Sequence, residues 1–297
     1  MDWYTPPETP PPPPPPSKAR CVMGALLPLA LHFLFQFIMT AFIVAPVIFD
    51  ILSENADIFF MDSPLYTRAV MDATLYSGLV SIAVFYFMYR HRLRKSLIAS
   101  ERARGPAALL LTVSLIAIAG NFAFVSLITA VQDLMGTELP TSSLDGLLEG
   151  ADPLVLLLSV CVAAPIAEEL CFRALALGNL RRAFPFWTAN LIQAALFGVI
   201  HIIPLQIGYA FLFGLLLGWI FHRTGRFGAA VLAHIVFNTS NILLGLIPGI
   251  EPLMNDPFRL LLLLFLPSAA VLFLGIRLLG ASTGGGETTA QNGTKNL

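Results

Sequence analysis

Long apolar stretches alternate with short polar connections along most of the chain. A helix needs about 20 apolar residues to cross the hydrocarbon core of a bilayer, and stretches of about this length recur eight times. They lie near residues 23–49, 72–89, 106–131, 153–178, 186–203, 205–221, 227–247 and 258–279. The pattern predicts an all-α fold, a polytopic transmembrane helical bundle of about eight spans.

Both ends of the chain depart from this pattern. Residues 1–20 contain an unbroken proline run, Pro10–Pro16, which can form polyproline II but cannot pack as a helix. Residues 281–297 are rich in Gly, Thr and Asn, a composition typical of disorder. We therefore expect disordered tails at both ends. The first apolar stretch is too long for a signal peptide and should remain as a membrane anchor.

The connections between the stretches alternate in charge. Residues 90–105 carry six basic side chains, and the short connections after residues 178 and 221 carry two each. The connection 132–152 instead carries five acids and no base, and 50–72 is mainly acidic. Lys and Arg accumulate on the cytoplasmic side of membrane proteins. Eight spans then place both termini in the cytoplasm, and we expect an integral protein of a bacterial inner membrane.

Composition excludes two broad classes of protein. Only 12% of the 297 residues are charged and 57% are apolar, whereas soluble proteins carry about a quarter charged residues. The net charge of -1 provides no electrostatic surface for nucleic acid. The three cysteines form no CxxC motif and lie in apolar sequence, so we expect small core residues at Cys21, Cys161 and Cys171.

Three charged residues lie within six positions of one apolar stretch: Glu168, Glu169 and Arg173. Each unpaired charge at the centre of a bilayer costs about 2.5 to 3.5 kcal/mol on insertion scales. Glu169 and Arg173 are spaced i,i+4, so they share a helix face and can form an ion pair. Glu168 points about 100° away. A buried pair that only joins two helices would not need this second acid, which favours a functional site.

Two later stretches carry histidines. His201 ends the segment Phe197–His201, and His234 lies i,i+4 from Asn238, so that both polar groups face one side of their helix. A carboxylate in a low-dielectric site is a suitable general base for water, a histidine can share its proton or hold a metal, and an amide can stabilise an oxyanion. Such a cluster could hydrolyse an amide bond. The remaining histidines are expected to be incidental: His32, which has no polar company, and His91 and His222 at basic edges.

These motifs, in this order, resemble the CPBP intramembrane protease family. The family is also called the type II CAAX prenyl endopeptidase or Abi family and includes the eukaryotic Ras-converting endopeptidase. The motifs are Glu-Glu-x-x-x-Arg at 168–173, Phe-x-x-x-His at 197–201 and His-x-x-x-Asn at 234–238. The resemblance implies a four-helix catalytic core in residues 151–250, with N-terminal transmembrane helices in 21–150 and a last one in 251–280.

The resemblance also implies a role for each motif position. Glu168 would activate the hydrolytic water together with His201, while His234 and Asn238 would stabilise the oxyanion. The remaining two residues would support the site: Glu169 and Arg173. The implied reaction is hydrolysis of a peptide bond in a membrane-associated protein or peptide, of which a prenylated CAAX substrate is one kind, within the lipid bilayer.

A metal ion is the one candidate cofactor. The candidate ligands of a zinc ion are Glu168, His201 and His234, and their spacing decides neither for nor against it. An HExxH zinc motif is absent from the sequence. A GxSxG nucleophile elbow is also absent, so the sequence favours activated water over a serine nucleophile.

Counting along the predicted spans raises a question about depth. At 1.5 Å per residue, Glu168 and His234 lie about 10 to 15 Å below the cytoplasmic boundary, and His201 lies about 22 Å below it. A shared site then requires the fifth helix to begin outside the bilayer or the turn after His201 to be buried in the protein. We expect both in part, with a cavity open towards the cytoplasm.

Two other classes of function compete with a protease. A non-catalytic membrane scaffold or bacteriocin self-immunity protein would not need the second acid, Glu168. A proton-coupled transporter could use Glu and His to relay protons, and would show pH-dependent uptake without a cleaved product.

Overall fold

A computed structural model describes residues 16–54, 63–98, 106–136, 150–201, 204–247, 253 and 256–283. These residues form helices and no strand, which confirms the all-α fold. The helices begin and end as follows: α1 Lys18–Met39, η1 Thr40–Val44, α2 Ala45–Glu54, α3 Pro64–Ile98, α4 Pro106–Met135, α6 Pro153–Leu156, η3 Leu157–Ala163, α7 Ala164–Glu169, η4 Leu170–Leu177, α8 Gly178–Leu180, α9 Phe186–Val199, α10 Pro204–Thr224, α11 Phe227–Gly245, α13 Pro257–Leu260, η5 Leu261–Phe265 and α14 Leu266–Thr283. The η segments have π-helical geometry.

Seven helices in the described part of the chain are long and apolar enough to cross a membrane. The fifth predicted stretch, 186–203, differs. It forms the 14-residue helix α9, which spans about 21 Å at 1.5 Å per residue and is too short to cross alone. The ring of Phe186 at its start stacks on His222 at the end of α10, with 3.9 Å between centroids. Helices α9 and α10 therefore form an antiparallel hairpin.

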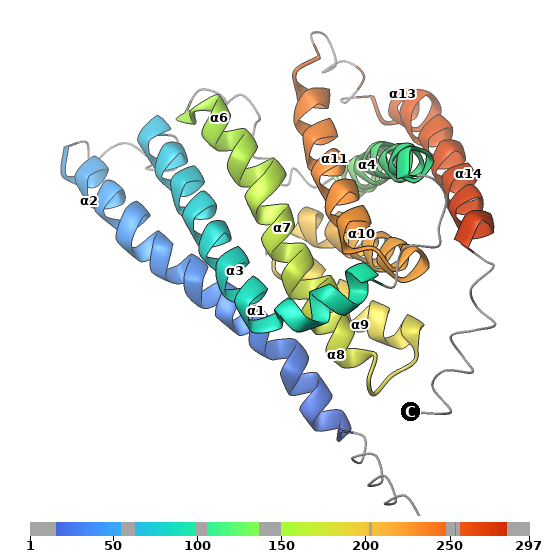
Figure 1. Ribbon diagram of the computed structural model, residues 1–297. Coiled ribbons are helices and arrows are strands. Elements are labelled where there is room, and N and C mark those ends of the chain that lie inside the picture. Colours follow the sequence, from blue (N-terminus) through green and yellow to red (C-terminus); the bar gives the residue numbers. More distant parts are fainter. Residues whose placement is uncertain are drawn as a thin grey trace, which may run out of the picture.

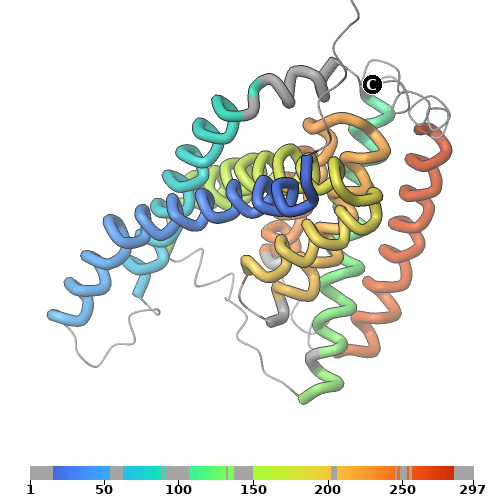
Figure 2. Tube along the Cα trace, turned by 90° about the horizontal axis from the view of Figure 1, so that it is seen from below, coloured from blue at the N-terminus to red at the C-terminus, as the bar shows by residue number. Residues whose placement is uncertain are grey.

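The helices pack in two groups around a central one. The helix running from Pro153 to Leu180 through α6, η3, α7, η4 and α8 packs against α1 and α3 on one side (Figure 1). On the other side, α11 contacts η3 and α7 and also packs against α4, while α4 packs against α14. Figure 2 shows α4 and α14 side by side, away from α1 and α3. The second half of the central helix is consequently enclosed, and η4 is buried along nearly its whole length.

The central helix carries both local start signals and an interruption. Asp152 caps it by accepting a hydrogen bond from the amide of Leu154 at 2.8 Å, and Pro153 occupies the first turn, where a missing N–H is harmless. Pro165 has no amide hydrogen either, and the preceding residues adopt the wider turns of η3. The π-helical segments bracket α7, the short segment that carries Glu168 and Glu169.

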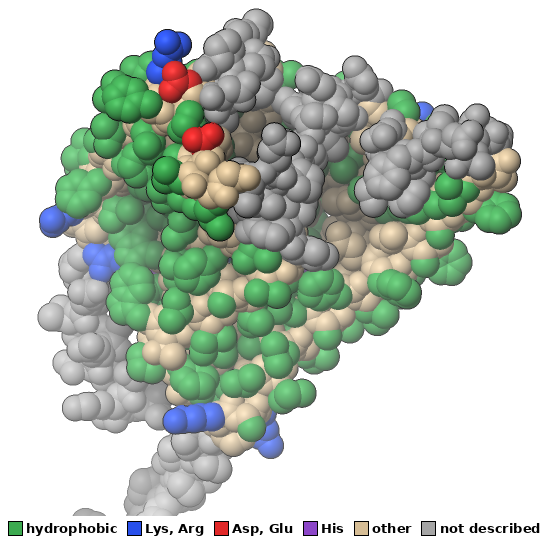
Figure 3. All heavy atoms as spheres, turned by 180° about the vertical axis from the view of Figure 1, so that it is seen from behind, with side chains coloured by type: hydrophobic (Ala, Val, Ile, Leu, Met, Phe, Trp, Pro, Cys, Tyr) green, Lys and Arg blue, Asp and Glu red, His purple; other side chains and the backbone are tan. Residues whose placement is uncertain are grey.

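Apolar side chains cover most of the visible outer surface, and charged side chains are few and lie near its margins (Figure 3). This is the surface expected of an integral membrane protein.

The described helices run beyond the predicted tail boundaries. Helix α1 begins at Lys18, where Ser17 caps it by accepting from the amide of Arg20, and α14 continues to Thr283. Residues 1–15 and 284–297 of the predicted tails lie outside the described residues.

Candidate active site

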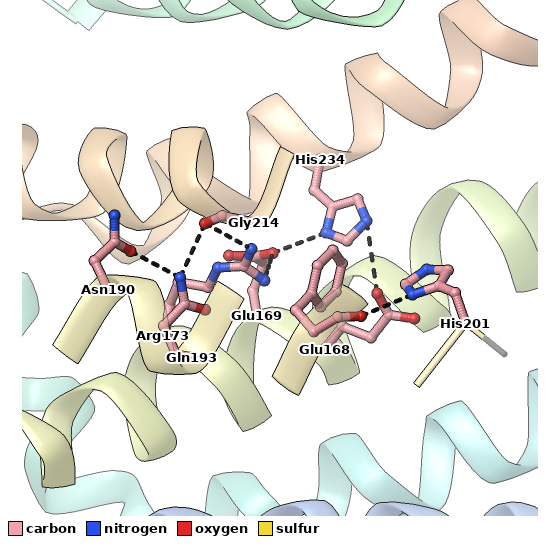
Figure 4. Close-up of polar contacts among 9 residues, drawn as sticks. Glu168, Glu169, Arg173, Asn190, Gln193, His201, Gly214 and His234 are labelled. Carbon is pink, nitrogen blue, oxygen red and sulfur yellow. Dashed lines mark hydrogen bonds and ion pairs between the residues drawn. The ribbon is translucent and has the colours of Figure 1, made fainter. Parts of the chain in front are cut away.

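The Glu169 carboxylate links two helices in the interior. Its Oε1 accepts hydrogen bonds from an NH1 of Arg173 and from Nδ1 of His234, each at 2.8 Å (Figure 4). The side chains of Glu169 and Arg173 are fully buried, and that of His234 is nearly so. The i,i+4 pairing of Glu169 with Arg173 agrees with the spacing, and the structure adds His234 of α11 as a third member.

Glu168 turns away from this pair and faces the other edge of the same imidazole. Its Oε2 lies 3.7 Å from Nε2 of His234. A carboxylate can only accept, so Nδ1 of His234 carries the hydrogen that Glu169 receives. Nε2 of His234 is then directed towards Glu168. Glu168 is 16% exposed whereas Glu169 is fully buried, so Glu168 is the acid that water can reach.

His201 is oriented in a similar way, directly after the end of α9. Its Nδ1 lies 2.8 Å from the carbonyl oxygen of Phe197. A carbonyl oxygen can only accept, so Nδ1 donates and Nε2 is left for a proton or a ligand. Both histidines thus have Nδ1 engaged by the protein and Nε2 available, an arrangement that fixes the ring and its tautomer.

The Phe197 ring packs between the two histidines and the arginine. Its centroid lies 5.0 Å from that of His201 and 5.8 Å from that of His234, with edge-to-face geometry. The guanidinium carbon of Arg173 lies 4.5 Å from the same centroid, within cation–π distance. One aromatic side chain therefore brings together the motif residues of three helices.

Glu168 and His201 line one cavity of about 150 Å³. Its walls come from α1, α3, α7 and the end of α9, where Ile200 lies beside His201. His201 and Glu168 thus share one site, while the depth of that site in the bilayer stays a prediction and residues 202 and 203 of the turn lie outside the described part of the chain. That the cavity opens towards the cytoplasm stays a prediction.

Asn238 lies outside this group of contacts. Its Nδ2 donates to the carbonyl oxygen of Val160 at 2.8 Å, and it does not line the cavity. Val160 belongs to the π-helical segment η3, where the usual helical partner of a carbonyl is displaced. In the structure, Asn238 therefore joins α11 to η3.

His32, which the sequence suggested was incidental, also lines the cavity. Its Nδ1 lies 3.0 Å from the hydroxyl oxygen of Ser81 on α3. The expectation that it lacks polar company is wrong, since Ser81 is 49 residues away in sequence. A signal was nonetheless present: Gln36, which also lines the cavity, lies i,i+4 from His32, the same spacing as His234 and Asn238.

A second polar network contacts Arg173 of the ion pair, and it was not predicted from the sequence. Gln193 Nε2 donates to Asn190 Oδ1 at 2.7 Å and to the carbonyl oxygen of Gly214 at 2.9 Å. An NH2 of Arg173 reaches the same carbonyl at 3.4 Å (Figure 4). The α9–α10 hairpin is thereby connected to Arg173 and, through it, to Glu169.

Zinc binding by Glu168, His201 and His234 is an expectation from the sequence. Among the described residues, no three His, Cys, Asp or Glu side chains come together in a cluster that could hold one. The oxygen of Glu168 and Nε2 of His234 are neighbours, but the set of Glu168, His201 and His234 remains a prediction.

Comparisons with known proteins find one family and one curated relative. Residues 150–240 match the family model for type II CAAX prenyl endopeptidase, Rce1-like. The sequence is 30% identical over 104 residues to "Putative membrane peptidase YdiL" of Bacillus subtilis (strain 168), which is 33% of this chain and 40% of the relative. The chain thus covers less than half of that relative. Solved structures yield no significant match. The resemblance inferred from the motifs is confirmed over this region.

Proposed function

We propose that this chain, through its Rce1-like region, is an intramembrane endopeptidase that hydrolyses a peptide bond of a membrane-associated substrate. The observation that carries the proposal is that Glu168, the acid that water can reach, lies beside Nε2 of His234 and lines one cavity with His201, whose Nδ1 is engaged by the protein. The match of residues 150–240 to a CAAX endopeptidase family supports a CAAX-type substrate.

Glu168 and His201 activate water in the proposed reaction. Water enters the cavity between them, and Glu168 takes one of its protons as the oxygen attacks the carbonyl carbon of the substrate. The proton then passes to the nitrogen of the leaving amine as the C–N bond of the tetrahedral intermediate breaks. His201, with Nδ1 engaged by its own helix, accepts a hydrogen bond from the water at Nε2 and orients it.

His234 stabilises the oxyanion in this proposal. Its Nδ1 donates to Glu169, so Nε2 can donate only when the ring is an imidazolium. The carboxylates of Glu169 and Glu168 lie on either side of the ring and are complementary to that charge. Asn238, one turn beyond His234, donates to Val160 of η3 and in this proposal holds α11, and with it His234, in position. Arg173 neutralises Glu169 and holds it in position.

The test is cleavage of a panel of prenylated and membrane-tethered peptides by the purified protein in lipid. We expect the wild type to release product and Glu168→Ala and Glu168→Gln to lose it by about 10³-fold or more, with unchanged insertion and melting temperature. Glu168→Gln is the matched control for shape, because it keeps the side chain's size and removes its basicity.

The same assay separates the remaining alternatives. A chelator arm tests the zinc set, since loss of activity with the chelator and its return with zinc would support a bound metal. A wild type that cleaves none of the panel, or variants that cleave as fast as the wild type, would contradict a Glu168-dependent protease. If the Glu168 variants released as much product as the wild type, the cleavage would come from a contaminating enzyme.

A further inference from the structure

Two polar residues of the cavity wall have no role in the proposed hydrolysis. His32 and Gln36 of α1 line the cavity together with Glu168 and His201. Helix α1 lies outside residues 150–240, the region matched by the family model. The cavity is therefore completed by a part of the chain that the comparison does not cover.

The polar side chains of α3 in the cavity have already used their hydrogens. Thr74 donates its hydroxyl to the carbonyl oxygen of Val70 at 2.8 Å, and Ser77 donates to that of Thr74 at 3.0 Å. These hydroxyls can still accept but not donate. Donors on the α1 and α3 walls are consequently limited to the ring of His32 and the amide of Gln36.

His32 is held in one orientation. Its side chain is buried, at 8% exposure, and Nδ1 lies 3.0 Å from Ser81 Oγ. When Ser81 donates to Nδ1, the hydrogen of the neutral ring is on Nε2, where it can serve as a donor.

The side-chain amide of Gln36 has few possible hydrogen-bond partners on its own helix. Gln36 is the next residue on the His32 face, one turn along α1, and it lies near the middle of the apolar helix Lys18–Ser53. Residues 33–35 and 37–39 beside it are all apolar, so on this stretch of α1 the amide has no polar neighbour other than His32. A polar group in apolar surroundings requires a partner, and the cavity that Gln36 lines is where a partner can be bound.

We propose that His32 and Gln36 form a subsite for the peptide backbone of the substrate. A substrate peptide in the cavity brings amide groups that must be satisfied away from water. The Gln36 side chain can donate to a substrate carbonyl and accept from a substrate N–H, and His32 Nε2 donates to a neighbouring carbonyl. The inference rests on the proposed function and assigns to α1 the binding of the peptide that Glu168 hydrolyses.

The test separates binding from hydrolysis. A fluorescent farnesylated CAAX peptide is titrated against the Glu168→Gln protein in nanodiscs, with anisotropy as the readout. Adding Gln36→Leu, which preserves bulk and removes both hydrogen-bonding groups, should raise Kd about tenfold or more. In the Glu168-intact protein the same change should raise KM and leave kcat nearly unchanged, the signature of lost ground-state binding. His32→Gln, which keeps a donor, should be milder than His32→Leu.

Phe37→Leu is the control on the same helix, because Phe37 is 71% exposed and does not line the cavity. It should leave Kd unchanged. Equal Kd values with and without Gln36→Leu, or no binding by the Glu168→Gln parent, would overturn the subsite. If the wild type cleaves nothing yet the parent binds the peptide and Gln36→Leu weakens it, the proposed hydrolysis fails and the subsite stands.

Discussion

Arg173 is the cation that pairs with the buried carboxylate of Glu169. Arg173 lies 2.8 Å from Oε1, both side chains are fully buried, and Oε2 has no hydrogen-bond partner among the described residues. Arg173→Ala would leave a buried carboxylate without its cation, a change that costs roughly 3–5 kcal/mol when one member of a buried pair is removed. We expect a lower melting temperature and less folded protein by fluorescence-detected size exclusion.

The double variant Glu169→Gln, Arg173→Met distinguishes a folding defect from a catalytic one. It removes both charges and retains most of the volume, so the melting temperature should recover towards that of the wild type. Cleavage should not recover, because the amide of Gln at position 169 can donate as well as accept and no longer fixes the hydrogen on Nδ1 of His234. An Arg173→Ala protein as stable as the wild type would contradict this account.

Sequence spacing predicted the contacts made within one helix and missed several made between helices. Glu169 with Arg173 follows from i,i+4 geometry, whereas Ser81 and Val160 give no indication in sequence of their partners, His32 and Asn238. Such partners depend on how helices pack, which residue spacing does not contain. The polar pairs themselves were visible as interruptions of apolar sequence.

At the scale of helices, the hairpin of α9 and α10 positions His201 by close packing. A Cβ on Gly218 would overlap Asn190 Oδ1 and lie 2.9 Å from Gln193 Nε2, and Gln193 donates to the carbonyl of Gly214 on α10. Gly218→Ala should push the helices apart and displace the end of α9. We expect lower melting temperature and activity, both measured on the purified protein.

Gly228→Ala on α11 is the matched control, because a Cβ there meets no heavy atom within 4 Å. Alanine is favoured over glycine in a helix by roughly 0.5–1 kcal/mol, so this variant should be as stable as the wild type or more so. Equal behaviour of the two substitutions would show that close packing at Gly218 is unimportant.

Helix positions follow closely from the apolar pattern, but helix ends do not. All eight predicted stretches are helical over most of their length, because backbone groups in lipid must bond within their own segment. The end of α9 at Val199 was not predicted, since Ile200, Ile202 and Ile203 continue the apolar run. The π-helical segments η3 and η4 were also not predicted, as no residue pattern distinguishes them from α-helix.

At the scale of the whole molecule, the α9–α10 hairpin affects the side of the membrane on which we expect each terminus to lie. Stacking of Phe186 on His222 shows that α9 begins where α10 ends, so we expect the two together to return the chain to the side of the membrane from which it entered. The other six apolar helices are an even number of crossings. A returning hairpin together with six crossings predicts that both termini lie on one side of the membrane, as eight spans did.

Both termini should therefore lie on one side, and the basic connections indicate the cytoplasm. A fluorescent protein fused at the C-terminus should fluoresce, and alkaline phosphatase fused there should be inactive. Phosphatase inserted after Gly136, at the start of the acidic connection 137–149, is the control and should be active. Active phosphatase at the C-terminus would mean that α9 and α10 do not form a returning hairpin in the membrane, and Phe186 and His222 would then lie on opposite sides of it. Arg181 lies just before the start of α9 and Arg223 lies at the end of α10. The basic residues therefore place this end of the hairpin in the cytoplasm, which requires an inactive phosphatase at the C-terminus.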